Sequence, residues 1–373
     1  MELPRMSALA SLLLQHSEVI RPSSSSTKFR RGFSHFLIGK WSLVLTVIFA
    51  ARWSVEVLLA SNSETRRVPI LLLSGSLVCP LFIRFLARRR DDVGNIMINL
   101  SSISAFMEEF GCHSTQVFLS TTARFLNGMR RFYTGFAMVQ FFGVMHTTYG
   151  YRDVSPIVAL LTSVSPLLAW LLYVVNTLGV MCALAAFYET QTYVFLLFSS
   201  CAFLWRALGV ECEQGGKASS LKSCTEIHAG LVSSARYLRG LLASLVAQWT
   251  CTVLLLPFKA TVDLITDFRV DIVALTCFTD ILTMFLPACL VGQALRDSTE
   301  SLRTGLYFAP WLEESGRARR DRARFMLGAD CKPRLVALSG LLTFNAPFFL
   351  DVIHHWFGIL NVFLSLHSNK ANL

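Results

Sequence analysis

Five ionisable side chains lie inside apolar stretches of the C-terminal third of the sequence: Asp271, Asp280, Asp351, His354 and His355. Carboxylates and imidazoles can act as general acids and bases, as metal ligands or as stations on an ion pathway. The two histidines are adjacent, so on a helix they point to different faces, and no cysteine or carboxylate cluster completes a metal site beside them. The three aspartates are too dispersed to indicate a reaction. We therefore expect neither an enzyme nor a bound metal or cofactor.

Composition places the chain among membrane proteins. Of the 373 residues, 53% are hydrophobic and only 16% are charged, and the mean hydropathy is +0.52. These values are far from those of soluble domains. The formal net charge of +10 is then explained by basic cytosolic loops rather than by nucleic acid. The ten cysteines include no Cys-x-x-Cys pair, which leaves most of them as small buried hydrophobic residues.

The pattern of apolar stretches predicts an all-α fold with seven transmembrane helices. A helix crossing a hydrocarbon core of about 30 Å needs about 20 residues. The 164–208 stretch is roughly twice that length, so its helix must continue beyond the membrane or break near Glu189. Residues 91–131 have an amphipathic pattern that indicates a cytosolic-side helix. The predicted spans are 36–60, 68–86, 132–149, 164–208, 238–262, 270–295 and a last one after the basic connector 296–334.

Lysine and arginine concentrate in the N-terminal segment and in the connectors 84–131, 206–239 and 296–334. The positive-inside rule then places the N terminus in the cytosol and, with seven spans, the C terminus outside. Residues 1–35 are expected to form a cytosolic tail. This orientation is opposite to that of G-protein-coupled receptors, whose Asp-Arg-Tyr and Asn-Pro-x-x-Tyr motifs are also absent.

The C-terminal part contains, in this order, a Cys-x-x-Gly element, a Thr-x-x-Leu-x-x-x-x-Tyr-x-x-x-Trp segment, a basic stretch at 317–324 and a Lys-Pro pair. In this combination it resembles the insect odorant receptors. Leu350-Asp351 followed by Gly358 weakly echoes the family's co-receptor, but the short second cytosolic connector does not, which favours an odorant-tuning subunit. The matching residues are Cys289, Gly292, Thr299, Leu302, Tyr307, Trp311, 317–324, Lys332 and Pro333.

This resemblance implies a ligand-gated, non-selective cation channel in the plasma membrane of olfactory sensory neurons. Members of the family form tetramers with a shared co-receptor, and their partners are small volatile odorants and membrane lipid, not nucleic acid. The implied organisation is a tail (1–35), helices one to six with the odorant pocket (36–295), an anchor that includes the inner part of helix seven (296–347), and an outer, pore-lining part (348–373). A break near Asn345, Ala346 and Pro347 divides helix seven.

The resemblance also suggests where ligand and ions lie. Odorant recognition is expected in the outer halves of spans two, three, four and six, whose apolar residues suit a small volatile molecule. Pore lining is expected on one face of the last helix, where apolar rings can close a channel by dewetting. The expected ligand-binding residues are Leu73, Ser74, Leu77, Phe141, Val144, Met145, Tyr149, Trp170, Tyr173, Phe278 and Leu282. The expected pore residues are Asp351, Ile359, Val362, Leu366 and Asn369.

Several alternatives stay open at this stage. A gustatory receptor would share the architecture, but its usual Thr-Tyr-x-x-x-x-x-Gln-Phe ending is absent. A multispan transporter or enzyme would need clustered intramembrane polar groups. The pore face could instead pack against helix five or six. Asp351 is expected either to face a wet vestibule or to pair with His355, four residues further on.

Overall fold

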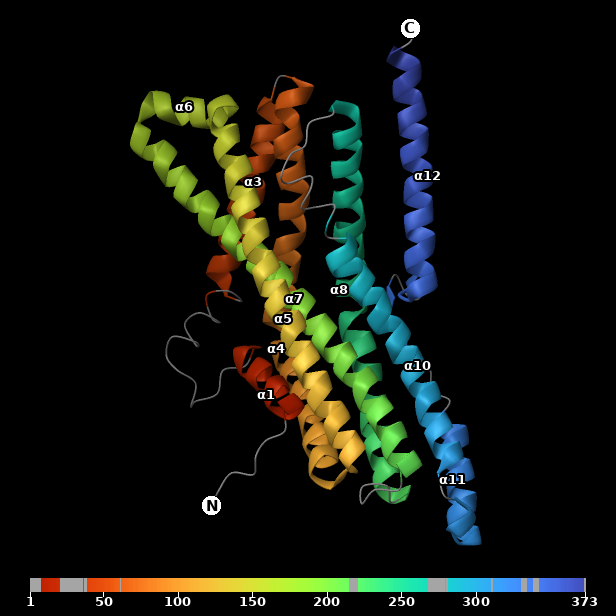
Figure 1. The fold of residues 1–373 in the computed structure, drawn as a ribbon. Coiled ribbons are helices and arrows are strands. Elements are labelled where there is room, and N and C mark those ends of the chain that lie inside the picture. Colours follow the sequence, from red (N-terminus) through yellow and green to blue (C-terminus); the bar gives the residue numbers. More distant parts are fainter. Residues whose placement is uncertain are drawn as a thin grey trace.

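Long helices make up nearly all of the described chain in the computed structural model (Figure 1). They run side by side along one axis, with α6 and the C terminus at one end, called here the α6 end, and α1 and α11 at the other, the α11 end. The described residues are 8–20, 36, 39–60, 62–214, 221–267, 279, 281–309, 311–329, 334–337 and 342–371. The elements are α1 (Ala8–Ile20), α3 (Lys40–Leu59), α4 (Ser63–Phe110), α5 (His113–Gly150), η1 (Tyr151–Val154), α6 (Pro156–Val164), α7 (Pro166–Gln214), α8 (Leu221–Asp267), η3 (Ile281–Phe285), α10 (Leu286–Phe308), η4 (Trp311–Glu313), α11 (Gly316–Gly328), β1 (Val336–Ala337), β2 (Leu342–Thr343) and α12 (Ala346–Ala371).

The first six predicted spans correspond to helices wherever their residues are described, apart from single residues near their ends. Span one is α3, and span two forms one continuous helix, α4, with part of the amphipathic segment. The remainder of that segment joins span three in α5. By length and composition, the helical stretches Lys40–Leu59, Val68–Phe110 and Pro166–Gln214 are each suited to crossing a membrane.

Helix α7 is the central element. It is a single helix of 49 residues without a break near Glu189, so the long apolar stretch continues past the membrane-spanning length. The side chains of its first turns are largely exposed. From Asn176 onward most of its side chains are buried, and the helix contacts α3, α4, α5, α8 and α10. Trp205 and Phe198 are among its fully buried side chains. The main hydrophobic core therefore surrounds the second half of α7.

The N-terminal segment differs from the expected tail because residues 8–20 form α1. Leu9, Leu13 and Ile20 are buried against the bundle, and the Ser101 hydroxyl of α4 donates a hydrogen bond of 3.1 Å to the Ala10 carbonyl. The apolar residues recur at helical spacing and make a stripe that needs a partner. With 13 residues, α1 is too short to cross a membrane but long enough to form a helix packed against the core.

The sequence predicts that the inner part of span seven, residues 334–344, is helical. This prediction is wrong for the residues that the structure describes. β1 and β2 pair as antiparallel strands there, with Val336 opposite Thr343 and Ala337 opposite Leu342. The break itself is where it was predicted, because α12 begins at Ala346. Asn345 sets this boundary: its Oδ1 accepts a hydrogen bond of 2.8 Å from the Phe348 N–H, as an N-cap residue does.

Helices α7 and α10 approach so closely that glycine is required on both. A Cβ added at Gly305 of α10 would lie 2.2 Å from the carbonyl oxygen of Gly209, and one added at Gly209 of α7 would lie 2.9 Å from the Ser301 carbonyl oxygen. Gly292 is similarly tight, because its Cβ would lie 2.1 Å from the Phe344 carbonyl oxygen. Backbone atoms cannot yield as a flexible side chain can, so these positions fix the helix spacing.

Glu211, near the end of α7, caps the start of α5. The carboxylate is fully buried, and its Oε2 accepts hydrogen bonds from the Cys112 N–H at 2.7 Å and from the Thr115 hydroxyl at 3.0 Å. A carboxylate at a helix N terminus is stabilised by the helix dipole and by otherwise unpaired N–H groups.

We expect Glu211→Ala to lower stability by about 2 kcal/mol, because it removes the oxygen that accepts both hydrogen bonds and leaves the Cys112 N–H without that acceptor. The corresponding fall in melting temperature, measured on detergent-purified protein, is about 4 °C. Glu213→Ala is the matched control, because Glu213 is exposed two residues further on. Equal melting temperatures for the two variants would contradict the capping role.

Two buried histidines should make stability depend on pH. Burial lowers the pKa of His16 below 6.5, with a smaller lowering from Arg130, and burial lowers the pKa of His228 as well. The unfolded chain then binds more protons, so stability is complete above about pH 6.5 and falls as pH drops towards the native values. His228→Leu should flatten the melting-temperature profile between pH 7.5 and 5.5, whereas His113→Leu, at an exposed position, should not. An unchanged profile in His228→Leu would refute this assignment.

Candidate functional site

An aromatic cluster lies at the α6 end, separate from the main core. Its buried members come from four helices and η1, and partly buried apolar side chains pack around them. The Trp53 ring is its centre, with ring centroids 6.1 Å from Phe49 and 5.9 Å from Tyr151. The buried members are Phe49, Trp53, Leu72, Val144, Tyr151 and Val180, and the partly buried ones are Val68, Leu73, Phe141, Met145 and Leu184.

A polar network on α3 closes this cluster and holds α6. The Arg52 guanidinium lies 4.6 Å above the Trp53 ring and 4.0 Å from the Glu56 carboxylate. Ser155 donates a short hydrogen bond to Glu56 and accepts one of 3.2 Å from the Val158 N–H. Ser155 is thus the N-cap of α6 and ties that helix to α3.

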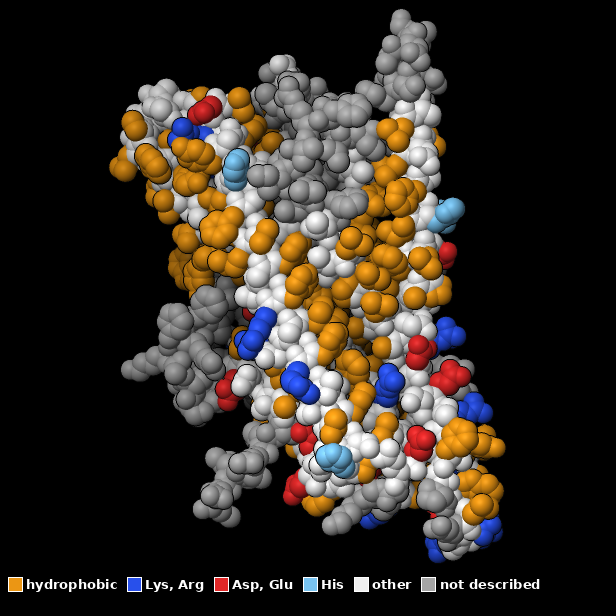
Figure 2. All heavy atoms as spheres, viewed as in Figure 1, with side chains coloured by type: hydrophobic (Ala, Val, Ile, Leu, Met, Phe, Trp, Pro, Cys, Tyr) orange, Lys and Arg blue, Asp and Glu red, His pale blue; other side chains and the backbone are white. Residues whose placement is uncertain are grey.

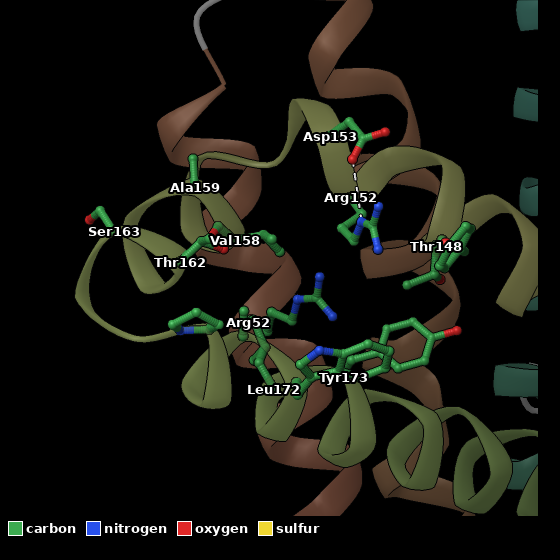
Figure 3. Close-up of a pocket in the computed structure, with 14 residues that line it drawn as sticks. Arg52, Thr148, Arg152, Asp153, Val158, Ala159, Thr162, Ser163, Leu172 and Tyr173 are labelled. Carbon is green, nitrogen blue, oxygen red and sulfur yellow. Dashed lines mark hydrogen bonds and ion pairs between the residues drawn. The ribbon is translucent and has the colours of Figure 1, made fainter.

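Beside the aromatic cluster is a cleft of about 530 Å³ between α3, the end of α5, η1, α6 and the start of α7 (Figure 3). Arg52 reaches into its middle, with Arg152 and Asp153 on one side and Tyr173 on the other. Tyr173 makes edge-on contacts with Tyr149 and Trp170, each with centroids 6.2 Å apart. The lining residues are Arg52, Thr148, Tyr149, Arg152, Asp153, Val158, Ala159, Thr162, Ser163, Pro166, Ala169, Trp170, Leu172 and Tyr173.

The predicted ligand-binding residues fall into separate places. Leu73, Phe141, Val144 and Met145 meet in the aromatic cluster. Tyr149, Trp170 and Tyr173 line the cleft. Leu77 and Leu282 are more than half exposed, at 55% and 53%, and belong to neither group. Phe278 and the side chain of Ser74 lie outside the described residues.

The sequence prediction missed the contribution of α3. Phe49, Trp53 and Arg52 come from span one, which the predicted pocket does not include. A signal was present: Arg52 and Glu56 are four residues apart inside an apolar stretch, where a charge needs a partner and often marks a functional site.

The described part of α12 has one face towards the protein and one away from it. Trp356 and Leu360 are buried, and Val352 and Ile353 pack against the main core. At about 100° per residue, the opposite face carries Asp351, Gly358 and Val362, all exposed. Ile359 is also exposed but lies towards the flank, and the side chains of Leu366 and Asn369 are outside the described residues.

The Asp351 carboxylate does not pair with His355. The His355 Nδ1 lies 2.7 Å from the backbone carbonyl oxygen of Asp351, to which it donates, and both side chains are exposed. The carboxylate is exposed, and its placement in a wet vestibule stays a prediction. Within the described ranges, no group of three or more His, Cys, Asp or Glu side chains is arranged to hold a metal ion.

The fold of the whole chain is similar to that of two solved structures. The structure of the insect olfactory receptor OR5 from Machilis hrabei in complex with eugenol superposes with a TM-score of 0.71, over 97% of this chain and 98% of that one, at 13% identity. A second structure of the same receptor superposes with a TM-score of 0.69, over 96% of both chains, at 14% identity. The chain has the fold of an insect olfactory receptor.

The olfactory-receptor fold extends from near the N terminus to α12, well beyond the C-terminal motifs that suggested it. No protein-family model and no curated protein matches the sequence. The surface of the fold is strongly apolar where α6 and α7 meet and along the middle of the bundle (Figure 2). Exposed leucine and valine side chains of α6 and α7, among them Leu160, Val164 and Leu167, make up part of this surface.

Proposed function

We propose that this chain belongs to the insect odorant receptor family and is an odorant-tuning subunit of a ligand-gated, non-selective cation channel. The observation that carries the proposal is the superposition of nearly the whole chain on an olfactory receptor whose structure includes eugenol. The C-terminal motifs support it independently, because they involve residues that set the fold. At Gly292, part of the Cys-x-x-Gly element, an added Cβ would lie 2.1 Å from the Phe344 carbonyl oxygen, so this glycine allows α10 to approach the segment leading into α12.

The odorant binds at the aromatic cluster, through Leu73, Phe141, Val144 and Met145. Volatile odorants are small and mostly apolar, and such ligands bind in sites lined by apolar and aromatic side chains. The cleft beside the cluster is less suitable because Arg52, Arg152 and Asp153 line it. Burial of an apolar ligand there would leave guanidinium donors without acceptors, at a cost in free energy.

Helix α12 lines the pore in a tetramer formed with co-receptor subunits. Its protein-facing side contacts α8 and α10, while the face with Asp351 and Val362 has no cover within the described chain. In the tetramer, this face of α12 and the equivalent faces of the other subunits surround a central path for cations. The N terminus is cytosolic, the C terminus is extracellular, and the channel lies in the plasma membrane of olfactory sensory neurons, in agreement with the basic residues concentrated towards the α11 end.

Whole-cell recording tests the proposal. Cells expressing the chain together with an insect co-receptor are exposed to a panel of volatiles, with intracellular G-protein blockers present. We expect an odorant-evoked cation current that is absent from cells expressing the co-receptor alone. A response abolished by the blockers would instead indicate a metabotropic receptor. Responses to tastants with none to volatiles would favour a gustatory receptor.

Met145→Trp should raise the half-maximal odorant concentration about tenfold, equivalent to about 1.4 kcal/mol of binding free energy. The larger ring occupies space beside Val144 that the ligand would otherwise use, and partial burial of Met145 lets the helix accept it. Met138→Trp, at a mostly exposed position of the same helix, is the control. If both variants are expressed at the surface and respond like the parent chain, the odorant does not bind at the aromatic cluster.

A further inference from the structure

The cleft under α6 contains a buried guanidinium with unused hydrogen-bond donors. The Arg52 side chain is only 7% exposed, and within the described part of the chain its Nε and Nη1 have no hydrogen-bond acceptor. Glu56 lies 4.0 Å from Nη2, on another edge of the same group. Buried N–H donors of a cation are costly to leave unpaired, so the geometry favours an oxygen-bearing ligand in the cleft.

The charges around the cleft are nearly balanced. Arg52 lies close to Glu56, and the Arg152 Nε is 3.3 Å from the Asp153 carboxylate. A ligand therefore gains little from a net negative charge. It gains instead from oxygen acceptors that meet the free edge of Arg52, since charge-assisted hydrogen bonds are the strong ones. An overall neutral ligand with one anionic and one cationic group meets this requirement.

The aromatic side chains supply a complementary surface for the cationic group. Tyr149, Trp170 and Tyr173 meet edge to face along one wall of the cleft. Quaternary ammonium groups bind against such rings through cation–π attraction. The Tyr149 ring already has the Arg152 guanidinium 4.8 Å from its centroid, so cation binding by this wall is seen within the chain.

The surroundings of the cleft are those of a membrane interface. Tyrosine and tryptophan are typical of the headgroup level of a bilayer, where the polar part of a lipid could enter the cleft. Next to the cleft, the exposed side chains Leu167, Leu171 and Val174 form an apolar strip along the first turns of α7. Acyl chains can lie along that strip while the headgroup enters the cleft.

We propose that this cleft binds a zwitterionic phospholipid, with phosphate oxygens accepting from Arg52 and Arg152 and the ammonium group against Tyr149, Trp170 and Tyr173. The site is distinct from the proposed odorant site and does not depend on channel activity. The Arg52–Glu56–Ser155 connection also makes the bound lipid a neighbour of the N-cap that holds α6.

Native mass spectrometry of the full chain, titrated with dioleoylphosphatidylcholine, tests the proposal. Arg152→Gln, at an exposed position that should not affect folding, and Arg52→Lys, which keeps the charge beside Glu56 but loses the planar fork, should each weaken the tightest lipid site about tenfold. Arg317→Gln, on the exposed surface of α11, should leave it unchanged. Equal affinities for all four proteins would overturn the proposal.

Three further measurements identify the ligand and its place. Photoactivatable phosphatidylcholine in liposomes should cross-link to peptides containing Leu167 and Leu171; labelling only elsewhere would refute the site. Phosphatidylglycerol should bind no more tightly than phosphatidylcholine, and a preference for it of tenfold or more would contradict the zwitterionic assignment. Soluble glycerophosphocholine should compete weakly, because it lacks the acyl chains. If it binds as tightly as the lipid, the ligand is a soluble molecule and not a phospholipid.

Discussion

Gly305→Ala is expected to prevent correct packing of α7 against α10 and to remove most folded protein from the cell surface. The added methyl carbon would lie 2.2 Å from the Gly209 carbonyl oxygen and 2.8 Å from its carbonyl carbon. Both atoms are backbone atoms of a long buried helix, so relief requires separation of two helices that share the main core. Overpacking of this kind typically costs several kcal/mol, on the order of 3 or more.

Gly128→Ala is the control that isolates this steric effect. Gly128 lies inside α5, and nothing lies within 4 Å of a Cβ added there. Helix propensity favours alanine over glycine by about 1 kcal/mol at either position. The control should therefore be neutral or slightly stabilising by surface biotinylation and by melting temperature. Normal surface levels and melting temperature for Gly305→Ala would show that α7 and α10 are further apart than described.

Val362→Cys is expected to make the channel sensitive to a cationic methanethiosulfonate reagent applied from outside, with a loss of about nine-tenths of the odorant-evoked current. Val362 is exposed on the face of α12 opposite Trp356 and Leu360. In an assembled pore, each modified subunit adds a fixed positive charge next to the ion path. Several such charges at short range are expected to raise the barrier for cations by about 1.4 kcal/mol, which lowers the current about tenfold.

Phe357→Cys tests whether this effect depends on the face of the helix. Phe357 is exposed but points to a different side of α12, so its modification should leave most of the current. The parent chain treated with the same reagent controls for its own cysteines, of which Cys79, Cys182, Cys201, Cys212, Cys224 and Cys289 are buried. Loss of current in Phe357→Cys with none in Val362→Cys would place the pore on the other side. The experiment depends on the proposed channel activity.

Local patterns in the sequence were sufficient for the helical class and for most span positions. Apolar length predicts α3 and α7 directly, and the N-cap at Asn345 together with Pro347 predicts the start of α12. The helix α1 within the predicted tail was missed because hydrophobic length distinguishes spans from loops but not from short core helices. The strands β1 and β2 were missed because a two-residue pairing is decided by tertiary contacts and not by propensity.

The candidate site was only partly accessible from the sequence. Leu73, Val144 and Met145 do come together, because outer halves of neighbouring helices are close in any bundle of this kind. Leu77 lies one turn further along the same face of α4 as Leu73, yet it is exposed. Membership of the cluster therefore depends on how far along the helix its neighbours pack against it, and the sequence pattern does not contain that information.

The short pairing of β1 with β2 has a mechanical consequence for the helix that follows it. A continuous helix would force α12 to turn together with the basic segment at the α11 end, whereas two residues of paired strand transmit little torque. The base of α12 is nevertheless fixed, because the Phe344 backbone lies against Gly292 with no room for a methyl group. Any tilt of α12 would therefore pivot at that contact. For its 26 residues, a length of about 39 Å, a tilt of about 5° displaces the far end by about 3 Å.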